Sequence, residues 1–149
     1  MRISTNCYYL YDNKFGNEAL DYGFNWLKQR SADTGGLIAV HSFTHLLNYR
    51  NIKGLSNIDL IRKPPHRAII DGITFDIILP SSIIRHGINR PMLVIHPTRE
   101  FWNKLNHIRD LSEIFVISNT DVVGKWKKER KINRAGVHLT AFRHDNRLE

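Results

Sequence analysis

Short apolar runs alternate with longer amphipathic stretches along most of the chain. The runs at 37–42 (LIAVHS), 91–96 (PMLVIH) and 113–118 (EIFVIS) are nearly continuous in apolar residues. Continuous runs of this length are typical of strands that are buried on both faces of a sheet. Residues 2–11, rich in Tyr and Ile, and residues 137–142 (VHLTAF) also read as strands. The pattern therefore favours a parallel sheet with helices on both faces.

Between these runs, apolar side chains recur at helical spacing. Asn17 is a suitable N-cap, and Leu20, Phe24 and Leu27 after it form a stripe that would face the core. The same reasoning predicts four further helices: 42–50, with Ser42 as its cap; 55–63, ended by Pro64-Pro65; a helix capped by Thr98 whose stripe is Phe101, Leu105 and Ile108; and a helix capped by Asn119, Thr120 or Asp121 that carries Val122 and Trp126.

The middle of the chain departs from this alternation. Asp71-Gly72 separates two apolar runs, and this pair is a strong hairpin signal because a tight primed turn needs positive φ at both central residues. Ile73, Phe75, Ile77 and Leu79 would fall on one face of the second strand. We therefore expect an antiparallel pair inside or beside the parallel sheet.

Strands and helices in this order, with short connections, imply right-handed crossovers. We expect an α/β fold, a Rossmann-like three-layer sandwich with a mainly parallel, mixed sheet and one β-hairpin near Asp71-Gly72. The 149 residues suit one domain, which we place at residues 1–147. Leu148-Glu149 is interpreted as the remnant of an expression tag.

The composition of the chain predicts the cellular compartment of the protein. Hydrophobic residues make up 42% of the chain and charged residues 24%, as in a globular protein. No apolar run approaches the length of a membrane span, and the first residues lack the apolar stretch of a secretory signal. Cys7 stands alone, so no intrachain disulfide can form. These features predict a cytoplasmic protein without membrane contact.

The formal net charge is +8, and it is uneven: residues 61–149 hold 16 Lys/Arg against 9 Asp/Glu. This excess predicts an anionic partner, either a nucleotide, a phosphorylated small molecule or nucleic acid. Simple solubility is the alternative explanation of the same charge.

Polar side chains follow four of the predicted strands. The carboxyl ends of parallel strands meet at one edge of a sheet, where ligands of open α/β proteins bind. Helices that begin there direct free N–H groups at an anion. We therefore expect a phosphate-bearing small molecule or nucleotide at this edge, bound by Ser42, Ser81, Ser82, Thr98, Arg99, Ser118, Asn119, Thr120 and Asp121, with His41 and His96 as candidate catalytic acid or base groups.

A simpler explanation competes with this one. Ser, Thr, Asn and Asp are the best N-caps, so each could serve its helix alone. His41 and His96 are not preferred caps, although each could be a buried, hydrogen-bonded histidine. The sequence fixes neither a reaction nor a cofactor.

The sequence lacks the motifs of several common classes of enzyme and nucleotide-binding protein. No dinucleotide-binding glycine motif follows a strand, and neither a P-loop nor a G-x-S-x-G elbow occurs. His41 and His45 are four residues apart, but Ser42 stands where a zinc protease has its glutamate. We therefore expect no metal site.

A basic run at 125–131 (KWKKERK) supports a second interpretation, a nucleic-acid-binding accessory protein. It would use Lys125, Lys127, Lys128, Arg130, Lys131 and Arg134. The alternative is a solvated helix face with Trp126 turned to the core. A third interpretation is a noncatalytic subunit that contacts a partner protein. The oligomeric state stays open.

Overall fold

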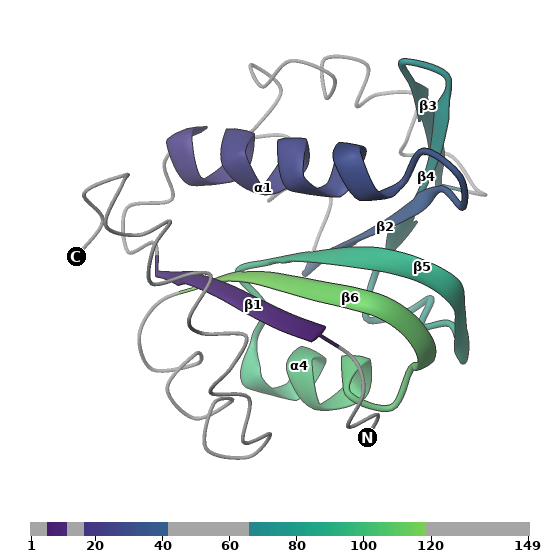
Figure 1. Cartoon of the computed structure of the whole chain (residues 1–149). Coiled ribbons are helices and arrows are strands. Elements are labelled where there is room, and N and C mark those ends of the chain that lie inside the picture. The colour runs from purple at the N-terminus through teal and green to yellow at the C-terminus, as the bar shows by residue number, and fades with distance from the viewer. Residues whose placement is uncertain (1–5, 12–16, 42–65, 119–149) are drawn as a thin grey trace.

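The computed structural model describes residues 6–11, 17–41 and 66–118. The elements in these ranges follow one another along the chain as shown in Figure 1. They are β1 (Asn6–Tyr11), α1 (Asn17–Arg30), β2 (Gly36–Val40), β3 (Arg67–Ile70), β4 (Ile73–Ile78), β5 (His86–Ile95), α4 (Arg99–Leu105) and β6 (Arg109–Ser118).

The strands form a single six-stranded sheet with the order β1-β6-β5-β2-β4-β3. The first five strands in this order are parallel to their neighbours, and β3 alone runs antiparallel, beside β4. The described part of the chain is thus an α/β structure with a mainly parallel, mixed sheet, as the sequence pattern predicts. β2 is buried along its whole length, as expected of a strand covered on both faces.

The two helices lie on opposite sides of the sheet, α1 above it and α4 below it in Figure 1. The predicted stripe of α1 is confirmed, since Leu20, Phe24 and Leu27 are all buried. The same helix approaches the sheet closely at Gly23, where an added Cβ would lie 2.7 Å from Ile117 and 2.9 Å from Leu93. The absence of a side chain at this position is what allows the helix to pack so near the central strands.

The predicted hairpin is also confirmed. β3 and β4 pair antiparallel up to Ile70 and Ile73, and the turn between them has φ values of 53° at Asp71 and 79° at Gly72. Positive φ at both central residues is the requirement of the primed turn that the Asp-Gly pair indicates. The hairpin lies at one end of the described sheet.

Several boundaries differ from the sequence prediction. β5 and β6 each have ten residues, so they begin well before the apolar runs at 91–96 and 113–118. Pro91 lies within β5 rather than at its start, at an irregularity of the pairing with β6, which is where a strand tolerates a residue without an N–H group. Asn17 is the first residue of α1 rather than its cap. α4 ends at Leu105, and Ile108 is buried beyond the helix.

The predicted helices at 42–50, at 55–63 and after Asp121, and the predicted strand at 137–142, lie outside the described residues. The single domain at 1–147 and the tag remnant stay predictions. In the described part of the chain, no helix is both long and apolar enough to cross a membrane.

Candidate functional site

Three of the predicted site residues follow one another across the carboxyl edge of the sheet. Val40 of β2 is in register with Ile95 of β5, and Ile95 is in register with Ile117 of β6. The next residues along the chain are His41, His96 and Ser118, and we call these three the rim. The backbone N–H of His96 donates to the carbonyl of Ile117 at 2.7 Å, so the pairing of β5 with β6 continues to this residue.

The rim lies where the chain changes direction across the sheet. After β5 the chain passes through α4 to β6, which is the neighbour of β5 on one side. After β2 the next described strand is β3, which lies beyond β4 on the other side. Such a reversal between two adjacent parallel strands is the usual location of ligand sites in open α/β sheets. His41 and His96 follow the two strands that flank it.

The two histidines differ in exposure. His41 is exposed, and its ring centroid lies 6.5 Å from that of Phe101 on α4. His96 is only 7% exposed. Its φ is 42°, in the left-handed region, and Pro97 follows it. A residue before proline is normally held in extended conformations, so the backbone at His96 is strained. Strain of this kind is concentrated at functional sites, where the surrounding structure maintains it.

Ser118, the third residue of the rim, is 1% exposed at the end of β6. Buried hydroxyl groups normally have a hydrogen-bond partner. The register of β5 with β6 puts this hydroxyl-bearing residue next to His96 in the row of the rim.

Thr98 is explained by helix capping. Its hydroxyl oxygen accepts a hydrogen bond from the N–H of Phe101 at 3.1 Å, as predicted for the N-cap of α4. Arg99 is exposed and is the first residue of that helix. Since α4 has only seven residues and is capped by its own threonine, its first turn contributes little to an anion site.

Ser81 and Ser82 follow β4, the neighbour of β2, and therefore lie at the same edge of the sheet as the rim. The N–H of Ser82 donates to the carbonyl of Leu79 at 2.9 Å, and its hydroxyl accepts from the N–H of Leu79 at 3.2 Å. Ser82 thus closes a turn, and both serines are exposed. The other predicted binding residues, Ser42, Asn119, Thr120 and Asp121, lie outside the described part of the chain.

A further histidine at this edge was missed from the sequence. His66 precedes β3, and its carbonyl accepts from the N–H of Ile77 near the end of β4. Because β3 runs antiparallel to the other strands, its beginning lies at the edge where their carboxyl ends are found. The predicted hairpin already implied this position.

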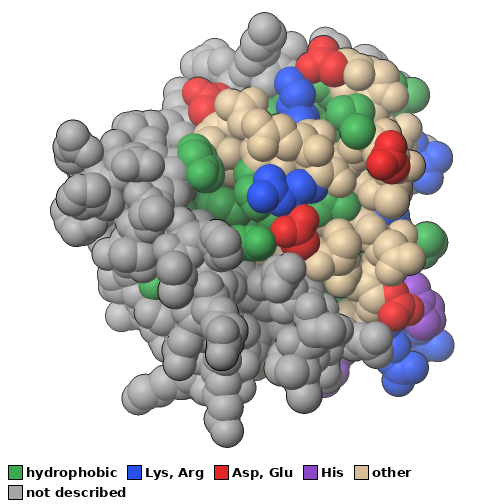
Figure 2. Space-filling model, viewed as in Figure 1, with side chains coloured by type: hydrophobic (Ala, Val, Ile, Leu, Met, Phe, Trp, Pro, Cys, Tyr) green, Lys and Arg blue, Asp and Glu red, His purple; other side chains and the backbone are tan. Residues whose placement is uncertain are grey.

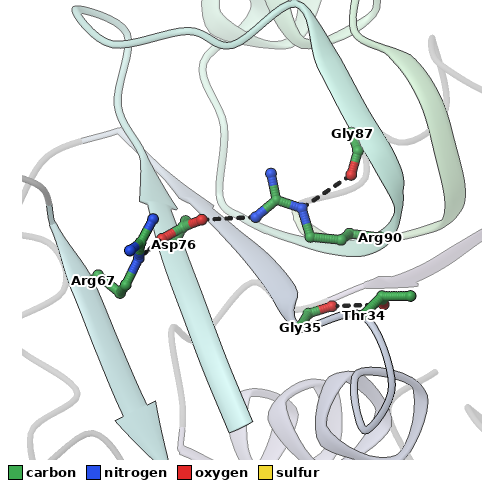
Figure 3. Close-up of polar contacts among 6 residues, drawn as sticks. All are labelled: Thr34, Gly35, Arg67, Asp76, Gly87 and Arg90. Atoms are coloured by element: carbon green, nitrogen blue, oxygen red, sulfur yellow. Dashed lines mark hydrogen bonds and ion pairs between the residues drawn. The ribbon is translucent and has the colours of Figure 1, made fainter.

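A second polar cluster lies away from the rim, and Figure 3 shows its geometry. Asp76 of β4 accepts from Arg67 Nε through Oδ1 and from Arg90 Nη1 through Oδ2, both at 2.7 Å. The hydrogen bond to Asp76, and then the attraction of its charge, raise the pKa of the Arg67 guanidinium above its ordinary value. Arg90 also donates through Nε to the carbonyl of Gly87 at 3.0 Å. With its oxygens occupied by arginines, Asp76 is an ion-pair partner rather than a catalytic carboxylate.

The net charge of the protein does not come from the described elements. Residues 6–11, 17–41 and 66–118 hold eight Lys/Arg and eight Asp/Glu, so the formal +8 lies in the remaining segments. The predicted nucleic-acid-binding residues at 125–134 belong to these segments. Across the described residues, no group of three or more His, Cys, Asp or Glu side chains has the geometry to hold a metal ion.

No protein-family model, curated protein or solved structure matches this chain.

Proposed function

We propose that the protein binds a phosphate-bearing small molecule or nucleotide at the carboxyl edge of its sheet, between the ends of β2 and β5. The observation that carries the proposal is the position of His41 and His96, which follow the two adjacent strands between which the chain reverses direction. Ligand sites of open α/β sheets concentrate at such a point.

The residues of the rim offer suitable chemistry. A protonated imidazole donates charge-assisted hydrogen bonds to phosphate oxygens, and the Ser118 hydroxyl adds a neutral donor beside it. Because His41 is exposed, it is available to the ligand from solvent. If the bound molecule reacts, His96 or His41 acts as the general acid or base. A Rossmann-like three-layer arrangement belongs to the same proposal, and the location of α1 and α4 on opposite sides of the sheet supports it.

An NMR titration of the histidine side chains tests the proposal directly. Inorganic phosphate, a sugar phosphate and a nucleoside 5′-monophosphate are each added to the uniformly labelled protein. We expect the imidazole resonances of His41 and His96 to shift in a saturable manner, and the melting temperature to rise with ligand concentration. His107, which lies just before β6 and away from the carboxyl edge, serves as the internal control. Equal shifts of all these histidines, or no shifts, would contradict the proposal.

Nucleic-acid binding through the basic carboxyl-terminal third is the second candidate function. The observation in its favour is the distribution of charge, because the described elements are neutral overall while residues 119–149 hold eight Lys/Arg against four Asp/Glu, which is half of the net excess. Contacts with phosphates release counterions, so this binding would weaken steeply with salt. We expect the combined substitution of Lys125, Lys127 and Lys128 by Glu to abolish a mobility shift that the natural protein gives at low salt. No shift with the natural protein would end this candidate.

A further inference from the structure

β5 and β6 extend beyond the rest of the sheet at the end opposite the rim. The described pairing of β2 with β5 begins at Met92, and that of β1 with β6 begins at Glu113. Within the described residues, the earlier parts of the two strands pair with each other alone, and in Figure 1 they curve away together from the other strands. We call this part, residues 86–90 with residues 109–111, the ribbon end.

The backbone of the ribbon end is strained. Ile88, Asn89 and Asp110 have φ values of 54°, 58° and 59°, in the left-handed region. Asparagine and aspartate tolerate this conformation, but a β-branched residue rarely adopts it. Ile88 is also 69% exposed, so little burial of its side chain offsets the strain. An exposed isoleucine held in an unfavourable conformation is better explained by a contact outside the fold than by stability.

The surroundings of Ile88 hold this conformation in place. Arg90 binds the Gly87 carbonyl through Nε and the Asp76 carboxylate through Nη1, which anchors the irregular segment to β4. Across the ribbon, His86 Nδ1 lies 3.3 Å from Asp110 Oδ2. Both ends of the strained segment are therefore fixed.

Two exposed arginines lie at or next to the ribbon end. The N–H of Arg109 donates to the carbonyl of Arg85, so these two exposed arginines lie side by side at the ribbon end. Neither has an ion pair with another described residue. At the right-hand margin of Figure 2, His side chains adjoin both Lys/Arg and Asp/Glu side chains. The surface thus combines two arginines that have no ion pair within the described residues, the exposed His86–Asp110 pair, the side chain of Ile88 and the exposed amide of Asn89.

We propose that the ribbon end contacts single-stranded nucleic acid. Guanidinium groups bind phosphates, the amide of Asn89 can donate and accept hydrogen bonds, and the face of an unpaired base is apolar enough to pack on Ile88. The bases of a duplex would have to unstack before one could pack on Ile88. Contacts with two arginines and one isoleucine do not offset the free-energy cost of unstacking. A lipid surface requires a larger apolar area than a single isoleucine supplies. The surface is at the opposite end of β5 from the rim, so the inference does not depend on ligand binding there.

Fluorescence anisotropy with a labelled single-stranded 20-nucleotide probe, followed over a series of salt concentrations, tests this inference. Substitution of both Arg85 and Arg109 by Gln should reduce the slope of log K against log salt by about 1.4 and the affinity at 0.15 M salt by about tenfold, because two phosphate contacts are lost. The double variant is compared with the variant in which Lys125, Lys127 and Lys128 are Glu. An unchanged slope in the arginine variant overturns the proposal and assigns any binding to other segments.

The Ile88→Asn variant tests the apolar contact. Asparagine tolerates the left-handed backbone, so the fold is retained while the aliphatic side chain is removed. We expect weaker binding with an unchanged salt slope. Ile69→Asn is the matched control, because Ile69 is 71% exposed on β3, away from the ribbon end. Equal affinity of the Ile88 and Ile69 variants overturns the proposal, as does binding to phosphatidylserine vesicles with none to the oligonucleotide.

Discussion

Arg90 forms an ion pair with Asp76 at 2.7 Å even though a strand of the sheet, β2, lies between β5 and β4. The contact is possible because β2 begins at Gly36, and Arg90 comes two residues before Met92, where the pairing of β5 with β2 starts. This pair connects the irregular part of β5 with the hairpin strand.

We expect Asp76→Asn to lower the free energy of unfolding by about 1–2 kcal/mol, since the Arg90 side chain is only 15% exposed and loses its charged partner. Arg67 contacts the same carboxylate but is 52% exposed, so Arg67→Gln should cause a smaller loss. Urea denaturation of both variants measures the difference. If the Asp76 variant is as stable as the Arg67 variant, the ion pair between Asp76 and Arg90 contributes little to the free energy of unfolding.

The turn at Asp71-Gly72 gives a purely conformational prediction. Gly72 has a φ of 79°, and an added Cβ would meet no atom within 4 Å. Gly72→Ala should therefore destabilise the protein by about 1–2 kcal/mol through backbone strain alone. Gly72→Asn should cost less, because asparagine tolerates positive φ. Thermal unfolding that ranks these two variants in the opposite order would contradict the primed turn.

Gly36 illustrates a steric requirement instead. An added Cβ there would clash with Ser31 Oγ and lie 3.0 Å from the ring of Phe75. Ser31 cannot move away easily, because its hydroxyl donates to the carbonyl of Leu27 at 2.6 Å in the buried interior. We expect Gly36→Ala to destabilise the protein by about 1–3 kcal/mol, as overpacked core variants do. The midpoint of urea denaturation measures the loss of stability. A variant as stable as the natural protein would mean that the backbone at the beginning of β2 shifts to make room for the added methyl group.

Ile88→Gly is expected to stabilise the protein. The left-handed backbone costs an isoleucine about 1–2 kcal/mol. Glycine removes this strain, but it loses more conformational entropy on folding than isoleucine does, which costs about 0.5–1 kcal/mol. The expected net gain in the free energy of unfolding is about 0.5–1 kcal/mol. The side chain is mostly exposed, so little packing is lost. A decrease in the free energy of unfolding would indicate that Ile88 serves the fold rather than an external contact.

His41→Ala tests the rim without disturbing the core. His41 is exposed, so its removal should leave the melting temperature of the ligand-free protein unchanged. If the imidazole donates one charge-assisted hydrogen bond to a phosphate, the affinity for a phosphate ligand falls about tenfold. His107→Ala is the matched control, because His107 is also exposed but lies just before β6, away from the carboxyl edge of the sheet. Equal loss of affinity in both variants would argue against a site between β2 and β5.

The strength of a local pattern decided how well each element was predicted. The stripe of α1 and the Asp71-Gly72 hairpin were correct because helical spacing and a primed turn are properties of a few adjacent residues. The early parts of β5 and β6 were missed because polar residues such as His86 and Arg90 give no strand pattern. These residues are in strands because β5 and β6 pair with each other there.

The candidate site divides in the same way. That polar residues follow the strands was evident from the sequence, and so was the role of Thr98 as a cap, which the structure confirms. The sequence did not show which of these residues would be neighbours, because nothing local encodes the order of the strands. Nor did it indicate that Asp76 joins two arginines, since the three residues are distant along the chain.

By itself, the sequence determined the types of the elements in the described ranges, the parallel character of the sheet and the position of its hairpin, because hydrophobic period and turn chemistry act over a few residues. Only the tertiary structure decided that β5 lies between β6 and β2, and that His41, His96 and Ser118 therefore lie in one row. The order of strands depends on how apolar surfaces pack over long separations in sequence, and that competition is settled by the whole chain at once.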